Sequence, residues 1–163
     1  MNILYLDFDG TMIPNKDSDG SDYIDWKLGL EHIFNKTIMA PLIMPMDKLQ
    51  NLFNSLNIDS MRYLTGRPMD SAKFIVEWSK KFNISFDMVL SSYPYPTYQE
   101  NRNKIEKKEF CWRKALMMLT TSMLSDNCYY YDSETNVKIK TNEYYKIAIQ
   151  HSRIILNEYS RNS

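Results

Sequence analysis

Short apolar runs alternate with helix-like patterns along the chain, and this alternation constrains the fold more than any other feature of the sequence. The apolar runs span residues 2–6, 61–64, 86–90 and 128–131. Apolar residues with helical spacing span 46–56, 70–82, 108–124 and 141–159. Strands that alternate with helices predict an α/β fold, with a mainly parallel central sheet and helices on both faces.

The fold predicted by this pattern is a three-layer α/β/α, Rossmann-like domain that spans residues 1–163. One segment, 12–44, has no clear pattern and is expected to be a short irregular insertion. Lys+Arg and Asp+Glu are balanced at 20 each, so bulk charge does not indicate a surface that coats nucleic acid. Cys111 and Cys128 form no disulfide framework, and no apolar stretch has the length of a signal peptide or a membrane span. We therefore expect a cytoplasmic protein with reduced thiols and no membrane partner.

Polar clusters follow three of the four predicted strands. Asp7 and Asp9 follow the first strand, the segment 65–67 follows the second, and Asp132 follows the fourth. In parallel sheets, ligands bind beyond the carboxyl ends of the strands. The sequence therefore predicts a binding site at this edge of the sheet.

The pair Asp7 and Asp9 suits chemistry on a phosphate ester. Two carboxylates held close together repel, and a divalent cation such as Mg²⁺ removes that repulsion and neutralises an anionic phosphate. One carboxylate can then attack phosphorus, while the other protonates the leaving oxygen. Gly10 allows a sharp turn after the pair, and the Thr11 amide is expected to bind an anion. The alternative is an ordinary turn, because Asp and Gly are common turn residues.

A second candidate phosphate site lies in Thr65-Gly66-Arg67. A hydroxyl group, free backbone amides and a guanidinium at the end of a strand can bind a phosphoryl group. The alternative for this segment is a turn followed by a helix cap.

Taken in order, these residues resemble the haloacid dehalogenase-like (HAD) hydrolase superfamily. The family's first motif, Asp-x-Asp-Gly-Thr, is matched by residues 7–11, and its second motif, often Thr-Gly-Arg, is matched by residues 65–67. The acidic fourth motif is similar to residues 129–134. The resemblance implies a phosphatase in which Asp7 is the nucleophile, Asp9 is the general acid and base, and Asp7, Asp9 (through its carbonyl) and Asp132 hold Mg²⁺. It also implies catalytic roles for Thr65 and for a lysine in a third motif.

The third-motif lysine has four candidates, Lys104, Lys107, Lys108 and Lys114. Lys108 shares a helical face with Trp112, Ala115 and Leu119, which is the face expected to pack on the sheet, so Lys108 is predicted as the catalytic lysine. The fourth motif departs from the commoner patterns, because Tyr131 precedes Asp132. Glu134 is a candidate to support the metal.

The segments that follow the first two motifs are too short for a large cap domain, so we expect an open site and a bulky substrate. The candidates are a nucleic-acid end, a large nucleotide and a phosphoprotein. Lys107–Arg113 has a short similarity to the phosphatase domain of phage polynucleotide kinase-phosphatases, too short to name a substrate. The loop 93–98, followed by Arg102, either stacks bases or is a rigid loop with two prolines. Two other functions remain open at this point: a phosphotransferase of the same fold and a non-catalytic phosphate-binding protein.

Overall fold

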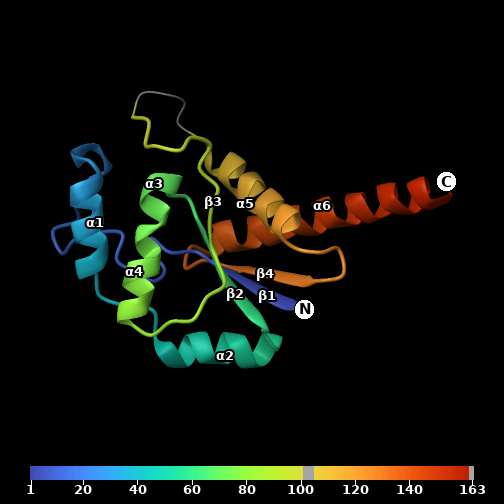
Figure 1. Ribbon diagram of the computed structural model, residues 1–163, viewed down its shortest axis with the longest axis horizontal. Coiled ribbons are helices and arrows are strands. Elements are labelled where there is room, and N and C mark those ends of the chain that lie inside the picture. The colour runs from blue at the N-terminus through green and yellow to red at the C-terminus, as the bar shows by residue number, and fades with distance from the viewer. Residues whose placement is uncertain (101–104, 162–163) are drawn as a thin grey trace.

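Four parallel strands form the centre of the protein (Figure 1). The computed structural model describes residues 1–100 and 105–161. The strands are β1 (Asn2–Leu6), β2 (Ser60–Thr65), β3 (Val89–Ser91) and β4 (Asn127–Tyr131), in the order β3-β2-β1-β4. Every neighbouring pair is parallel, so the carboxyl ends of all four strands meet at one edge. This confirms the predicted parallel sheet.

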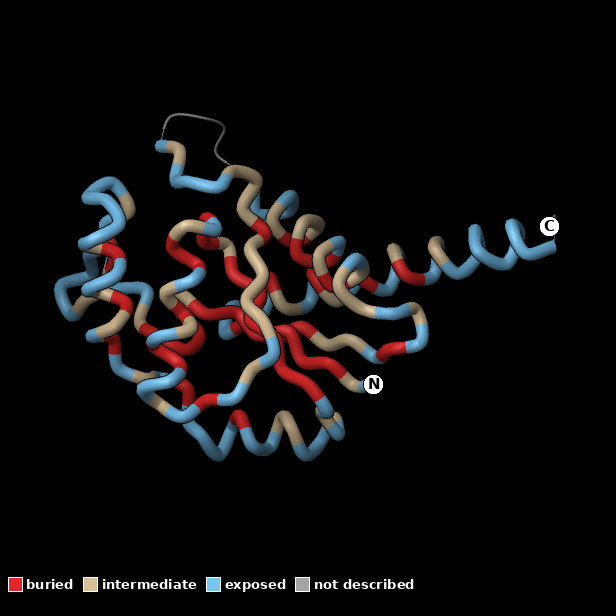
Figure 2. The backbone as a smooth tube through the Cα atoms, viewed as in Figure 1, coloured by how far each residue is buried: buried red, intermediate tan, exposed pale blue. Residues whose placement is uncertain are grey.

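Side chains of β1 alternate between two hydrophobic cores, one on each face of the sheet. Leu4 and Leu6 belong to one core, and Ile3 and Tyr5 belong to the other. All four are fully buried, and Figure 2 shows the strands as the buried centre of the protein. Two separate cores require a helical layer on each face, which is the predicted three-layer α/β/α arrangement.

Helices cover both faces. The first core is closed by α1 (Leu30–Met39), α2 (Met46–Leu56), α4 (Phe74–Lys81) and nearby segments, which include η1 (Trp26–Leu28). The short helix α3 (Met69–Ala72) contacts α1, α4 and β3. The second core is closed by α5 (Lys107–Thr121) and α6 (Thr135–Arg161), which pack against each other. The last turns of α6 project beyond the sheet (Figure 1). No described helix is both long and apolar enough to cross a membrane.

Several elements differ from the sequence predictions. The segment 12–44, predicted to be irregular, contains η1 and α1. The predicted helix 70–82 is divided into α3 and α4, and β3 begins three residues after the predicted start at 86. Leu30, Ile33, Phe34 and Ile38 of α1 do have helical spacing, but this helix is only ten residues long and follows an irregular polar run. Helix α6 begins at Thr135, six residues before the predicted start, and the buried Val137 extends the stripe that Thr141, Tyr145 and Ile149 continue.

Candidate active site

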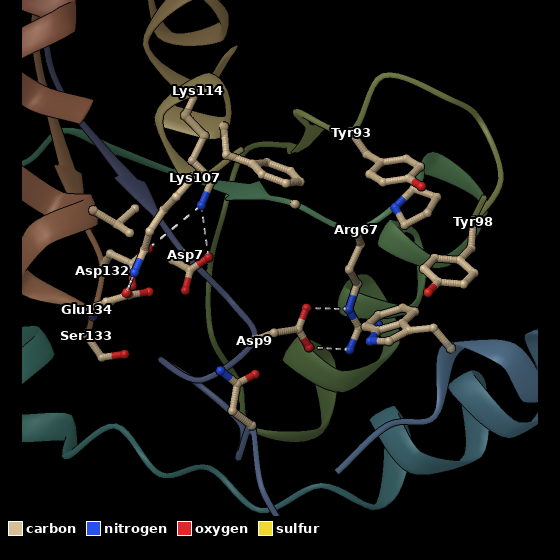
Figure 3. A pocket seen from close by; sticks show the side chains of 16 residues that line it. Asp7, Asp9, Arg67, Tyr93, Tyr98, Lys107, Lys114, Asp132, Ser133 and Glu134 are labelled. Carbon is tan, nitrogen blue, oxygen red and sulfur yellow. Dashed lines mark hydrogen bonds and ion pairs between the residues drawn. The ribbon is translucent and has the colours of Figure 1, made fainter. Parts of the chain in front are cut away.

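The predicted polar clusters meet at the carboxyl edge of the sheet. The amide of Asp7 donates to the Tyr131 carbonyl at 3.0 Å, which fixes the end of β1 beside the end of β4. Asp7 and Asp132 therefore lie next to each other (Figure 3). A cavity of about 510 Å³ opens here, and its lining includes the carboxylates Asp7, Asp9, Asp132 and Glu134, the cations Arg67, Lys107 and Lys114, and the aromatic residues Trp26, Tyr93, Tyr98 and Phe110.

The Asp7 carboxylate is buried and held on both oxygens. Thr11 donates its hydroxyl to Asp7 Oδ2 at 2.9 Å, and the Lys114 ammonium lies 3.3 Å from Asp7 Oδ1. Burial raises the pKa of Asp7 from 3.8 to about 6, against the opposing effect of Lys114, and the neighbouring Asp132 raises it further. The carboxylate is thus fixed in one orientation at the cavity wall.

The turn after Asp7 requires glycine at position 10. Gly10 has φ of +80°, and a Cβ atom there would lie 2.7 Å from the Asn15 side-chain nitrogen. The Thr11 amide donates to the Phe8 carbonyl at 3.1 Å, so it belongs to the turn and is not directed at an anion, contrary to the prediction. The Ser133 hydroxyl donates to the Gly10 carbonyl at 2.7 Å and ties this turn to the end of β4.

Lys114, Tyr130 and Asp132 form a buried chain of hydrogen bonds. The Lys114 ammonium donates to the Tyr130 hydroxyl at 2.5 Å, and that hydroxyl donates to Asp132 Oδ2 at 2.7 Å. Burial is the main cause that raises the pKa of the Tyr130 hydroxyl well above 10. The hydroxyl therefore keeps its proton and bridges Lys114 and Asp132. The Glu134 amide donates to the other Asp132 oxygen at 2.9 Å. Asp132 is therefore as firmly oriented as Asp7.

Lys114, and not the predicted Lys108, lies against Asp7. Lys108 is exposed and is absent from the cavity lining. The buried stripe of α5 comprises Cys111, Lys114, Ala115 and Met118, whereas Trp112 stacks on Tyr144 of α6 with ring centroids 4.0 Å apart. The face that contains Trp112 packs against α6 and not against the sheet. Lys104 lies outside the described residues.

Asp9 and Arg67 form a bidentate ion pair at the cavity wall (Figure 3). The guanidinium donates to both Asp9 oxygens at 2.8 Å. It also donates to the Thr37 hydroxyl at 2.9 Å and lies 5.1 Å from the Phe8 ring centre. The Arg67 side chain has no exposed surface, while the Asp9 side chain is 23% exposed. The phosphate-binding role predicted for Arg67 thus becomes, in this arrangement, a role in holding Asp9.

Thr65 and Gly66 differ in their relation to the cavity. Gly66 lines it, but Thr65 does not. The Thr65 hydroxyl is buried and accepts a hydrogen bond from the Arg67 amide at 3.1 Å, which shapes the turn after β2. Its contact is therefore with the backbone that positions Arg67.

Lys107 and Glu134 line the cavity and form an ion pair there. Both side chains are more than half exposed, so the pair contributes little to stability. The Glu134 carboxylate is directed at Lys107, and only its backbone amide contacts Asp132. The charge of Glu134 is thus balanced by a lysine.

The donors fit a magnesium ion that keeps much of its water. In the described parts of the chain, no cluster of three or more His, Cys, Asp and Glu side chains is arranged to hold a metal. Mg²⁺, however, is commonly held by one or two carboxylates together with water and substrate oxygens. Asp7 and Asp132 supply two neighbouring carboxylates at an open cavity, and the backbone carbonyl of Asp9 is a third candidate oxygen.

Several residues of the site were not predicted from the sequence. Ser133 and Asn15 line the cavity and are polar loop residues without a distinctive pattern. Tyr130 contacts Lys114 and Asp132 outside the cavity lining, and in the sequence it is one of three consecutive tyrosines in an ordinary strand. Trp26 enters the site from the segment predicted to be irregular. Of the loop 93–98, Tyr93 and Tyr98 line the cavity, while Arg102 lies outside the described residues.

The comparisons with known proteins bear on the fold. No protein-family model and no curated protein sequence matches this chain. A chain from the structure of the Pnkp1/Rnl/Hen1 RNA repair complex is similar to it, with a TM-score of 0.57 and 14% sequence identity. The match covers 88% of this chain and 40% of that chain, so this chain spans less than half of that chain's length. At this identity, the similarity shows a shared α/β fold.

Proposed function

We propose that this protein is a magnesium-dependent phosphomonoesterase of the HAD-like type, with Asp7 as the nucleophile. The observation that carries the proposal is the environment of Asp7, whose carboxylate is held by Thr11 and Lys114 at the wall of an open cavity. A buried carboxylate fixed in this way is suited to attack a bound phosphorus atom. Asp9, two residues further along, supplies the second carboxylate that the reaction needs.

In the first step, an Asp7 oxygen forms a bond to phosphorus while the bond between phosphorus and the leaving oxygen breaks. Protonated Asp9 gives its proton to that oxygen, so an alcohol leaves and an aspartyl-phosphate remains. In the second step, Asp9 takes a proton from water, the water oxygen attacks phosphorus, and inorganic phosphate leaves Asp7. Lys114 offsets the negative charge that accumulates beside Asp7 in both steps.

The charges at the site support a divalent cation. With Asp9 protonated for the first step, the carboxylates Asp7 and Asp132 balance the cations Lys114 and Arg67, so an anionic phosphate arrives without a counter-charge from these groups. Magnesium held by Asp7, Asp132 and the Asp9 carbonyl would offset the charge of the phosphate and of its nucleophile.

The substrate is proposed to be a nucleotide or a nucleic-acid end. The similar chain belongs to a structure titled as an RNA repair complex, which supports this class of substrate. The size of the cavity is also in keeping with this class, since pockets for small molecules measure roughly 300–1,000 Å³.

The test is hydrolysis of β-glycerophosphate and of nucleoside monophosphates, with Mg²⁺ and with excess chelator. We expect turnover only with metal, about 10²–10⁴-fold slower turnover in Asp9→Asn, and no phosphoenzyme in Asp7→Asn. Asp47→Asn, an exposed carboxylate in α2, is the matched control and should match the wild type. Undiminished turnover in chelator, or a phosphorylated Asp7→Asn protein, would refute the mechanism. Phosphate transfer to added alcohols would identify a phosphotransferase instead.

A further inference from the structure

We infer that Trp26 and Tyr98 form a binding wall for the nucleobase of the substrate. This inference rests on the proposed function, because it names the group that carries the phosphate. Both residues line the same cavity as Asp7 and Asp9, yet they come from distant segments, η1 and the loop after β3. The ring centres are 6.5 Å apart and the ring planes differ by 30°. The two rings therefore lie together at one part of the cavity lining.

The wall lies where the leaving group must go. Figure 3 shows Asp9 between Asp7 on one side and Arg67 and Tyr98 on the other. In the proposed reaction, Asp9 protonates the leaving oxygen, so the organic part of the ester extends from Asp7 past Asp9. That direction leads to Tyr98 and Trp26.

The wall is built before a ligand arrives. Lys27, next to Trp26, lies 3.0 Å from Glu100 in an ion pair between the two segments; both side chains are at least half exposed, so this pair contributes little to stability. Within the loop, the Gln99 amide donates to the Tyr93 hydroxyl at 3.1 Å, and Asp70 donates its amide to the Pro96 carbonyl at 3.2 Å. A ligand that stacks here does not have to order the loop first, which strengthens binding.

The charges beside the wall favour a neutral planar group over a second phosphate. Arg67 is paired with Asp9, and its guanidinium also lies 5.2 Å from the Trp26 ring centre. Lys27 is paired with Glu100. The Tyr98 side chain is 39% exposed, so part of its ring is open to a ligand. Stacking on such rings suits any base, because every base has a π-face.

The separation of the wall from the nucleophile favours a nucleotide over a phosphotyrosine. In phosphotyrosine the ring is bonded directly to the phosphate oxygen, whereas in a nucleotide the sugar separates the base from the phosphate. In Figure 3, Asp9 and Arg67 lie between Asp7 and Tyr98. This arrangement leaves room for a sugar next to Asp9.

The experiment compares kcat/KM for nucleoside 3′- and 5′-monophosphates, phosphorylated oligonucleotides, phosphotyrosine and β-glycerophosphate. The wild type should prefer a nucleoside phosphate to β-glycerophosphate, and Tyr98→Ala should lower that preference by about 5- to 150-fold. Tyr98→Phe should retain it. Tyr159→Ala is the control, since Tyr159 is an exposed tyrosine of α6 outside the cavity lining. A preference for oligonucleotides would identify a nucleic-acid end as the source of the base, and equal values would identify a free nucleotide.

Binding gives a readout that does not depend on turnover. In Asp7→Asn, a nucleoside monophosphate that stacks on Trp26 should quench tryptophan fluorescence, and an added Trp26→Phe substitution should remove most of this change. Trp78 is fully buried and Trp112 stacks on Tyr144, so neither contributes. Turnover without nucleoside preference and without quenching overturns the inference but leaves the proposed phosphomonoesterase activity intact. A preference for phosphotyrosine, or an equal effect of Tyr159→Ala, also overturns the inference. If no ester is hydrolysed, the proposed function is refuted. The fluorescence change then still tests whether a nucleoside monophosphate binds at Trp26 and Tyr98.

Discussion

Ionised Asp7 lowers the stability of the folded protein, and replacing it with asparagine should therefore stabilise the fold at neutral pH. Burial raises the pKa of Asp7 from 3.8 to about 6, even though Lys114 lies 3.3 Å away. The folded state thus holds a proton on Asp7 between these two values, where the unfolded chain does not. A native state that binds more protons than the unfolded state loses stability as the pH rises.

The magnitude follows from the two pKa values. The difference between 3.8 and about 6 corresponds to about 3 kcal/mol. Below pH 4, both states are protonated and Asp7 contributes nothing. From pH 4 to 6 the free energy of unfolding should fall by this amount, and above pH 6 the loss should be constant. Asp7→Asn has no such titration, although its Lys114 keeps only the more distant partner Asp132 and the Tyr130 hydroxyl.

Urea unfolding of both proteins in chelator, from pH 4 to 7.5, measures this effect. The difference in free energy of unfolding between Asp7→Asn and wild type should rise by about 3 kcal/mol as the pH rises from 4 to 6 and then stay level. Asp47→Asn, which alters an exposed carboxylate, should show no such rise. Added Mg²⁺ should stabilise the wild type at pH 7 far more than Asp7→Asn. A difference that does not change with pH, or that falls as the pH rises, would show that burial does not control Asp7.

Two further substitutions test the cations of the site. Lys114→Met should lower kcat by about 10²–10³-fold, as expected for loss of a group that stabilises transition-state charge. Lys108→Met is its control and should leave kcat close to wild type, because Lys108 is exposed outside the cavity. Arg67→Lys should lower kcat more than it raises KM, because a lysine cannot donate to both Asp9 oxygens. Steady-state kinetics with β-glycerophosphate measures both constants. A change in KM alone would assign Arg67 to substrate binding.

The parts of the fold that were predictable are those with strong local patterns. The strands at 2–6 and 128–131 are short apolar runs, each followed by an aspartate, and this pattern is visible in the single sequence. Helix α1 was missed although Leu30, Ile33, Phe34 and Ile38 have helical spacing. The helix is short and follows a polar, irregular run, so the whole segment 12–44 was predicted as one insertion.

The prediction of Lys108 as the catalytic lysine was wrong for a different reason. The helical face with Lys108, Trp112, Ala115 and Leu119 was predicted to pack on the sheet. Because α5 packs against both the sheet and α6, it has two buried faces, and the aromatic face belongs to α6. A lysine at the centre of the other buried stripe looks unfavourable in sequence, since lysine is seldom buried unless it is paired. The pairing of Lys114 with Asp7 and Asp132 depends on chain segments more than 100 and nearly 20 residues away, which a local pattern does not contain.

The unequal burial of the Asp9–Arg67 pair indicates which partner moves during the proposed reaction. Both Asp9 oxygens accept from Arg67, so one of these contacts has to open before Asp9 can give a proton to the leaving oxygen. Arg67 has no exposed side-chain surface and is also held by the Thr37 hydroxyl, the Ser71 carbonyl and the neighbouring rings of Phe8 and Trp26. Asp9 is 23% exposed at the cavity, and in this structure its carboxylate is held by Arg67 alone. The carboxylate is therefore the part free to rotate toward the substrate, while the guanidinium stays as its fixed anchor. An anchor of this kind acts on the chemical step and not on ground-state binding, which is why loss of the bidentate contact in Arg67→Lys should lower kcat more than it raises KM.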